Sequence, residues 1–179
     1  MKFILIFLSI LLYSIQIDSS INDFTYAKFF QLINERYIIC TGKGIYLYDS
    51  QLNNKLSEKI FDNEITSSDD LYFINIEQFS TEDGGNVIVL YKTKFYFFSS
   101  LGILLFEDDL TFTTEGVTYT LVPYKNNDML NFIVGYLGAG KTTMIGYYNI
   151  DISNKKITEI VTTNFIIIYI IGNTNILES

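Results

Sequence analysis

One stretch of this chain has the residue types and the spacing of a phosphate-binding loop. Gly135 is followed after four residues by Gly140, Lys141 and Thr142. In nucleotide-binding proteins the backbone N–H groups of such a loop hold phosphates, the lysine reaches the β- and γ-phosphates, and the threonine hydroxyl binds Mg²⁺. The chemistry also needs a helix after the lysine, because the helix N-terminus adds its dipole to the site.

The residues that follow the motif do not have the pattern of a helix. Residues 143–152 include a glycine and several aromatic and β-branched residues, and their apolar positions lack helical spacing. Only 37 residues follow Thr142 in the 179-residue chain, too few for the long crossovers of a doubly wound nucleotide fold. We therefore predict a fortuitous glycine-rich turn, with no bound nucleotide and no cofactor. Nucleotide binding through Gly135, Gly140, Lys141 and Thr142 is the least favoured alternative.

Three pairs of carboxylates lie in expected loops, at Asp69-Asp70, Glu82-Asp83 and Asp108-Asp109. None of them has the alternating aspartate spacing of a calcium-binding loop. Two carboxylates can also catalyse glycoside hydrolysis, so an exported hydrolase using the first or third pair is an alternative function. We expect solvated loop charges, no metal site and no catalytic residue.

Residue types on which enzymes and nucleic-acid-binding proteins depend are scarce. The chain has no histidine, so the commonest metal ligand and neutral-pH general base is missing. The formal net charge is −8, with only 12 lysines and arginines, whereas binding a phosphate backbone needs a basic face. These features predict a protein that binds no nucleic acid and is not an enzyme.

The first 20 residues have the features of a secretory signal peptide. Lys2 supplies the positive start, and residues 3–15 form an apolar stretch that is too short for a comfortable membrane span. Cleavage is expected after Ser19 or Ser20, with an uncleaved anchor as the alternative. We predict secretion or display at the cell surface, a single domain over residues 21–179, and no transmembrane span after the signal segment.

Cys40 is the only cysteine, so no disulfide can form within the chain. It lies in the apolar run of residues 37–40, and a thiol in such a run packs as a small hydrophobic group. We therefore predict a buried thiol. A disulfide to another chain, or a reactive thiol, is the alternative.

A hairpin-like hydrophobic pattern occurs three times, at residues 37–49, 87–99 and 132–150. Its first strand is apolar at successive positions in each copy, which indicates burial on both faces. Self-similarity at a period of this length is typical of stacked β-repeats. We expect the three aligned isoleucines to be buried. The aligned positions are Ile38, Ile88 and Ile133, at spacings of 50 and 45, and Tyr46, Tyr96 and Tyr147, at spacings of 50 and 51.

This pattern resembles the blades of β-propellers over about residues 36–163, without pointing to a particular family. The resemblance implies an all-β fold of antiparallel blade-like repeats, with units at about residues 36–61, 71–106 and 117–163. Propellers typically close with four to eight blades, so we expect a partial or open propeller, with a β-sandwich as the alternative. Pro123, the only proline, is expected to close the strand at residues 117–122. The apolar residues 165–171 suggest a truncated fourth unit at residues 164–179.

No catalytic arrangement emerges from these patterns, and loops on a rigid β-scaffold are a common binding surface. The sequence therefore favours a secreted or surface-exposed, non-catalytic binding module. Its partner is expected to be a protein or a glycan that contacts the loops.

Overall fold

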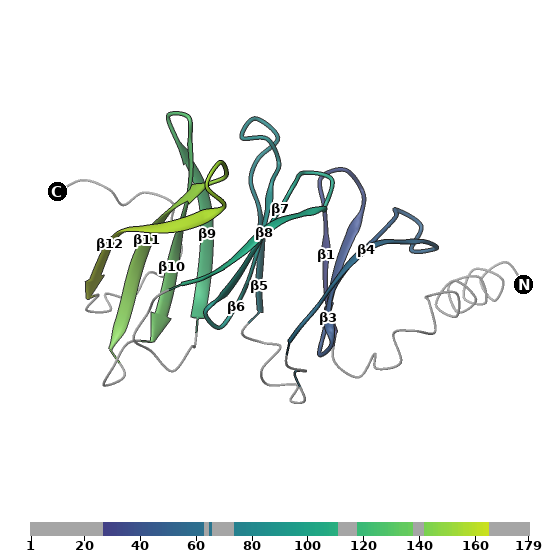
Figure 1. Cartoon of the computed structure of the whole chain (residues 1–179), viewed down its shortest axis with the longest axis horizontal. Helices are drawn as coiled ribbons and strands as arrows, with labels where there is room; N and C mark the ends of the chain where they lie inside the picture. The colour runs from purple at the N-terminus through teal and green to yellow at the C-terminus, as the bar shows by residue number, and fades with distance from the viewer. Residues whose placement is uncertain (1–26, 63–64, 66–73, 111–117, 138–141, 165–179) are drawn as a thin grey trace, which may run out of the picture.

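The computed structural model describes residues 27–62, 65, 74–110, 118–137 and 142–164, and this part of the chain consists of strands, turns and loops without a helix. Twelve strands form three antiparallel sheets of four strands each, and none of the sheets closes into a barrel (Figure 1). The strands are β1 (Ala27–Gln31), β2 (Tyr37–Thr41), β3 (Gly44–Tyr48), β4 (Lys55–Ile60), β5 (Ile74–Gln78), β6 (Val87–Tyr91), β7 (Lys94–Phe98), β8 (Leu104–Asp109), β9 (Thr118–Asn126), β10 (Met129–Leu137), β11 (Thr143–Asp151) and β12 (Lys156–Asn164).

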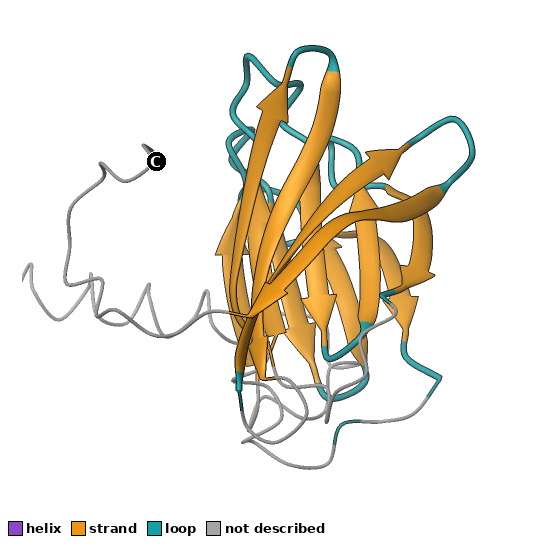
Figure 2. Ribbon diagram, turned by 90° about the vertical axis from the view of Figure 1, so that its left-hand side faces the viewer, coloured by secondary structure: helices purple, strands orange, loops and turns teal. Residues whose placement is uncertain are grey.

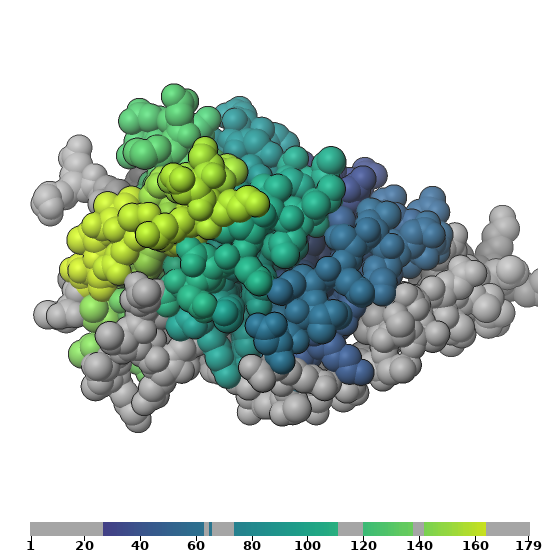
Figure 3. Space-filling model, viewed as in Figure 1, coloured from purple at the N-terminus to yellow at the C-terminus, as the bar shows by residue number. Residues whose placement is uncertain are grey.

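Each sheet is an up-and-down meander of consecutive strands: β1–β4 form the first sheet, β5–β8 the second and β9–β12 the third. The sheets stand side by side in chain order, with the second between the other two (Figure 1). In the space-filling view the colours follow one another across the molecule, so each sheet borders its neighbours in sequence (Figure 3). The prediction of an all-β fold with antiparallel blade-like repeats is confirmed, and the described sheets form an open stack.

The inner strands are apolar at successive positions because both of their faces are covered. Ile38, Ile39 and Cys40 in β2 are all fully buried, as are Ile88 and Leu90 in β6. The prediction that Ile38 and Ile88 are buried is therefore confirmed, and so is the buried thiol of Cys40. The outer strand β4 alternates between half-buried and exposed residues, as expected for a strand with one solvated face.

Two hydrophobic clusters hold the three sheets together. Neighbouring residues of β6 point to opposite faces, so Val87 and Val89 join the cluster against the first sheet, while Ile88 and Leu90 join the cluster against the third. Aromatic rings fill the second interface: the centroid of Phe132 lies 5.0 Å from that of Phe95 and 5.1 Å from that of Tyr148. The buried residues contributed by the facing strands are Ile38, Cys40, Ile45 and Leu47 opposite Val87, Val89, Tyr96 and Phe98, and Ile88, Leu90, Phe95 and Phe97 opposite Phe132, Val134, Tyr148 and Ile150.

A β-bulge at the same place in each sheet defines which residues are equivalent. The strand register shifts between Leu47 and Tyr48 in the first sheet. The second and third sheets shift at 97/98 and 147/148, at a constant spacing of 50. Tyr147 is therefore the counterpart of Leu47, and the sequence alignment of Tyr147 with Tyr46 was wrong by one residue.

Gly146 occupies the place in the third sheet that Tyr46 and Tyr96 occupy in the other two. It pairs with Val134, as Tyr96 pairs with Val89. An added Cβ at Gly146 would lie 2.5 Å from Cε2 of Tyr148, so the ring of Tyr148 covers this glycine. The alignment failed because a neighbouring tyrosine fills the space from the next inward-facing position.

The expectation that Ile133 is buried like Ile38 and Ile88 is also wrong. Ile133 is only half-buried. It pairs with Tyr147 on the side of the third sheet that faces away from the second sheet. No described sheet covers that side, whereas the corresponding sides of the first and second sheets are covered by the next sheet in the stack.

Two predicted boundaries differ from the structure. The first sheet begins with β1 at Ala27 rather than near residue 36, so the segment before residue 36 supplies an edge strand. β9 continues through Pro123 to Asn126, although Pro123 was expected to close the strand. β9 is an edge strand that pairs only with β10, so the missing N–H of Pro123 is tolerated there. Of the predicted fourth unit at residues 164–179, Asn164 ends β12, and residues 165–179 lie outside the described residues.

Candidate binding site at the loop end of the stack

The sequence that resembles a phosphate-binding loop is followed by a strand. Gly135 lies inside β10, Thr142 immediately precedes β11, and Gly140 and Lys141 lie outside the described residues. Gly135 pairs with Thr120, and an added Cβ would lie 2.8 Å from the Thr120 methyl carbon. Its small size is thus explained by strand packing. The structure has a strand where a phosphate site needs the N-terminus of a helix.

The carboxylate pairs do not meet in one site. Asp108 accepts a 2.8 Å hydrogen bond from the backbone N–H of Ile157, which joins β8 to β12 across two sheets. Asp109 forms an ion pair with Lys94, with Oδ2 and Nζ 2.8 Å apart. Asp69 and Asp70 lie outside the described residues. Within the described ranges, no three side chains of the histidine, cysteine, aspartate and glutamate types gather closely enough to hold a metal ion.

Six loops lie at one end of the stack. Because each sheet is a meander, the β1–β2, β3–β4, β5–β6, β7–β8, β9–β10 and β11–β12 connections all leave the same end of the strands (Figure 2). This end, at the top of Figure 1, is named the loop end below. It is the surface on which the loop-mediated binding predicted from sequence would occur.

Hydrogen bonds from the β1–β2 loop fix it to the β7–β8 loop of the second sheet. The side-chain amide of Asn34 donates to the carbonyl oxygen of Ser100 at 2.8 Å. The guanidinium of Arg36 donates to the carbonyl oxygen of Leu101, also at 2.8 Å. The only arginine of the chain therefore joins two loops from different sheets.

Gln78, the last residue of β5, links the β1–β2 and β5–β6 loops. Its Oε1 accepts a 2.8 Å hydrogen bond from the backbone N–H of Ile33, and its Nε2 donates to the carbonyl oxygen of Gly85 at 2.7 Å. A hollow of about 360 Å³ lies between the three joined loops. Its rim carries two aliphatic side chains that are about half exposed, Ile33 at 54% and Leu101 at 49%. Its lining consists of Ile33, Asn34, Gln78, Thr81, Gly84, Gly85, Ser100 and Leu101.

Side-chain caps order the loops that follow β3 and β11. Asp49 accepts hydrogen bonds from the Asn54 side chain at 2.7 Å and from the backbone N–H of Asn53 at 2.9 Å. Asp151 accepts from the side chain and the backbone of Asn154 at 2.7 and 3.0 Å. The Asn54 and Asn154 side chains are the main reason why the pKa of each aspartate lies below its ordinary value. The caps hold these loops in defined turns.

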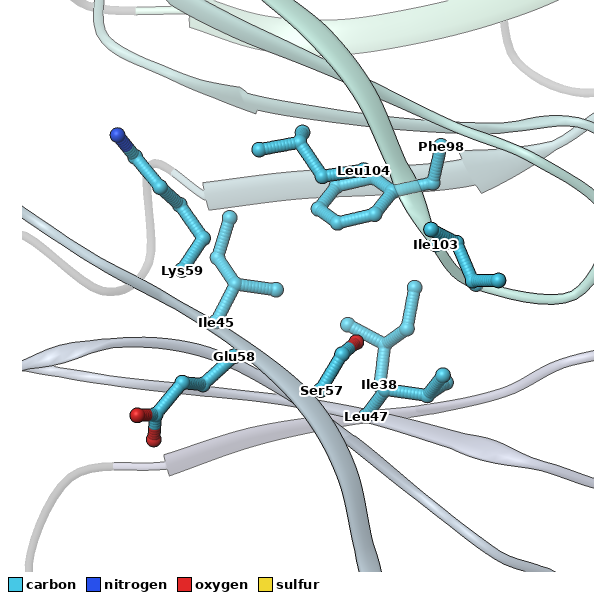
Figure 4. Close-up of a pocket in the computed structure, with 10 residues that line it drawn as sticks. Ile38, Ile45, Leu47, Ser57, Glu58, Lys59, Phe98, Ile103 and Leu104 are labelled. Atoms are coloured by element: carbon cyan, nitrogen blue, oxygen red, sulfur yellow. The ribbon is translucent and has the colours of Figure 1, made fainter.

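A second cavity, of about 220 Å³, lies between the first and second sheets (Figure 4). Its walls are apolar and include Ile45, Leu47, Phe98 and Leu104. The Ser57 hydroxyl points into the space, while the carboxylate of Glu58 points away from it (Figure 4). Lys59 at its border is engaged in a 2.7 Å ion pair with Glu107 of β8. This cavity is a gap in the packing between two sheets, with little polar chemistry for recognition.

No protein-family model matches this chain, and a search of curated proteins finds no similar sequence. The general resemblance to β-propeller blades, without a named family, is consistent with both results. None of the described segments is a helix long and apolar enough to cross a membrane.

Sequence reasoning identified the loops as a class but not the residues around the hollow. Asn34 and Ser100 are 66 positions apart, and no local sequence pattern predicts their contact. One periodic feature was available: Asp49, Ser99 and Asp151 each begin the loop after the third strand of a sheet, and each accepts hydrogen bonds from that loop. This periodicity marks the loop end, while the contacts between loops depend on how the sheets stack.

Proposed function

We propose that this protein is an exported, non-catalytic β-repeat protein that binds a partner through its loop end. The observation that supports this proposal is the set of hydrogen bonds that joins three loops from two sheets around one open hollow. A surface that is already ordered loses little conformational entropy when a partner binds. The side-chain caps on Asp49 and Asp151 add to that order.

The chemistry of the hollow favours a protein partner over a glycan. Its lining has no aromatic ring on which a sugar could stack, and its rim presents two aliphatic side chains, Ile33 and Leu101. Exposed aliphatic groups beside backbone carbonyls suit an apolar side chain of a partner protein. A glycan is the alternative partner.

Charge adds a second preference. The protein has a net charge of −8, and the loops around the hollow carry the exposed residues Glu35 and Glu82. A partner with a basic surface would associate faster at low salt, because opposite charges steer the encounter. Weak salt dependence of the association rate would argue against this preference.

The non-catalytic part of the proposal is supported by the carboxylates themselves. Asp108 and Asp109 are engaged in separate structural contacts. An exported hydrolase that depends on the third carboxylate pair is therefore less favoured than a binding protein. Loss of a measured hydrolytic activity on Asp108→Asn would reverse this order.

Two variants with matched exposure test the binding site. The purified protein is applied to an array of extracellular proteins and to an array of glycans, and each binder is then measured against Leu101→Asp and Ile60→Asp. Leu101 and Ile60 are 49% and 51% exposed, and Ile60 ends β4, at the opposite end of the stack. We expect Leu101→Asp to weaken binding at least tenfold and Ile60→Asp to leave it unchanged. Equal effects of both substitutions, or no binder on either array, would contradict the proposal.

A further inference from the structure

The outer face of the third sheet, turned away from the second sheet, repeats a surface that is buried in the other two sheets. Four residues in register cross this face, one on each strand: Val122, Ile133, Tyr147 and Val161. Directly opposed residues of antiparallel strands share a face, so these four side chains form one row. They are named the outer row below.

The equivalent rows of the first and second sheets are covered. Ile38 and Leu47 hold the corresponding central positions in the first sheet and are at most 3% exposed, because the second sheet packs on them. Ile88 and Phe97 hold these positions in the second sheet and are fully buried against the third. The fold therefore uses this row twice as the contact with the next layer.

The outer row itself is incompletely covered. Val122 and Val161 are each 48% exposed, and Ile133 and Tyr147 are half-buried. No charged residue lies in this row or in the two rows beside it. The solvated face of an antiparallel sheet normally carries polar and charged side chains. The flanking rows are Tyr124, Asn131, Asn149 and Thr158 on one side and Thr120, Gly135, Ile145 and Thr163 on the other.

The course of the chain points to what covers this face. After the outer strands β4 and β8, the chain continues into β5 and β9, the first strands of the sheets that cover the first and second rows. Residues 165–171 follow β12 directly, whereas 13 residues separate β4 from β5 and eight separate β8 from β9. All seven are isoleucine, phenylalanine or tyrosine. This composition has high β-propensity and gains most from burial against an apolar face.

We propose that residues 165–171 pack across the outer row of the third sheet, in the place that the next sheet takes in the first two repeats. A seven-residue strand is about 23 Å long, whereas four paired strands are roughly 14 Å apart from first to last, so the segment can cross the whole row. The attachment of residue 165 to β12 keeps the segment at high local concentration over this face.

The absence of tryptophan from the chain provides a clean test. The substitution Tyr147→Trp places a single indole in the outer row of the full-length protein. We expect blue-shifted emission and weak quenching by acrylamide. Phe29→Trp, at a position 52% exposed in β1, serves as the control for an uncovered indole. Red-shifted, readily quenched emission from Tyr147→Trp, equal to that of the control, would overturn the proposal.

Substitutions in the segment identify the occupant. Consecutive strand residues face opposite sides, so the two double variants Ile166→Asn/Ile168→Asn and Ile167→Asn/Tyr169→Asn are each combined with Tyr147→Trp. At least one of them should raise the quenching constant severalfold and shift emission to the red, while circular dichroism remains that of a β-protein. If neither does so, residues 165–171 are not the cover.

Dilution separates this cover from a second copy of the chain. Protection of the indole should be the same from 50 μM to 0.5 μM, roughly a hundredfold range chosen to span ordinary dimer affinities, with a monomer mass by light scattering. Protection that disappears on dilution together with a dimer would assign the outer row to an interface between two copies and overturn the proposal.

Discussion

Gly146 and Tyr148 together occupy the space that one tyrosine fills in each of the other sheets. The ring of Tyr148 lies over Gly146 and stacks on Phe132 at the interface between the second and third sheets. Glycine normally weakens a strand, so its replacement by alanine would ordinarily stabilise the protein. Here an added methyl group would meet the Tyr148 ring, which has no free space to move into.

We therefore expect Gly146→Ala to lower the free energy of unfolding by about 1–3 kcal/mol, as overpacking of a core does. Urea denaturation measures the change. The same substitution in a Tyr148→Leu background should cost much less, because the ring that it displaces is gone. An equal cost in both backgrounds would rule out the contact as the cause.

The Cys40 thiol is fully buried, and burial raises its pKa from 9.0 to about 12, with Lys28 opposing the shift. The folded protein therefore keeps the proton at pH values where the unfolded chain has lost it. Stability from this group is fully present below pH 9 and is lost between pH 9 and pH 12, with a slope of at most about 1.4 kcal/mol per pH unit.

Cys40→Ala should reduce this alkaline slope, as measured by urea denaturation at pH 8, 9 and 10. The native thiol should also fail to react with a thiol reagent until the protein is unfolded, because the reactive species is the thiolate. Rapid labelling of the folded protein would show that the thiol is accessible and would restore the reactive alternative.

At the scale of single elements, the outer strands are joined by polar contacts. Asp108 on β8 accepts a hydrogen bond from the backbone N–H of Ile157 on β12. Asp109, the next residue, forms an ion pair with Lys94 in which both side chains are about half exposed. We expect Asp108→Ala to cost about 1–2 kcal/mol, because it removes a charged acceptor from a part-buried N–H. Asp109→Ala should cost roughly 0.5 kcal/mol or less, as exposed pairs contribute little.

Thermal unfolding of both variants tests this contrast, and their adjacent positions make each a control for the other. Equal losses would mean that the contact between β8 and β12 contributes nothing beyond ordinary surface charge. A larger loss for Asp109→Ala would reverse the assignment of the two carboxylates.

The strands themselves could be predicted from sequence, because core positions such as Ile38 and Ile88 recur at a spacing of 50 and lie in continuous apolar runs. The bulges could not be predicted, because each extra residue is one more apolar residue on the last strand of its sheet: Leu56, Leu105 and Ile160. The sequence also did not reveal that β9 is an edge strand. Proline normally ends a strand, but Pro123 is tolerated in β9 because β9 pairs on one side only. The hollow depends on contacts such as that of Arg36 with Leu101, which arise only when sheets stack.

At the scale of the whole molecule, export is the prediction that most affects function. Lys2 and the apolar residues 3–15 should direct a reporter fused to residues 1–20 into the secretory pathway. Microscopy and glycosidase sensitivity of a reporter that carries its own sequon measure the outcome. Retention in the cytosol would contradict the prediction and would move the partner search to intracellular proteins.

The position of the second sheet between the other two has a consequence for how the molecule opens. Each layer contacts only its neighbours, so stability is the sum of the layers and their interfaces, as in a one-dimensional array. Opening should begin at the terminal layers, while the amide protons of β6 and β7 exchange only when the whole molecule unfolds. Native-state hydrogen exchange should therefore show a gradient that is slowest in the centre and faster toward β1 and β12. The protein would then open locally only in its first and third sheets, and the second sheet would be the last to unfold.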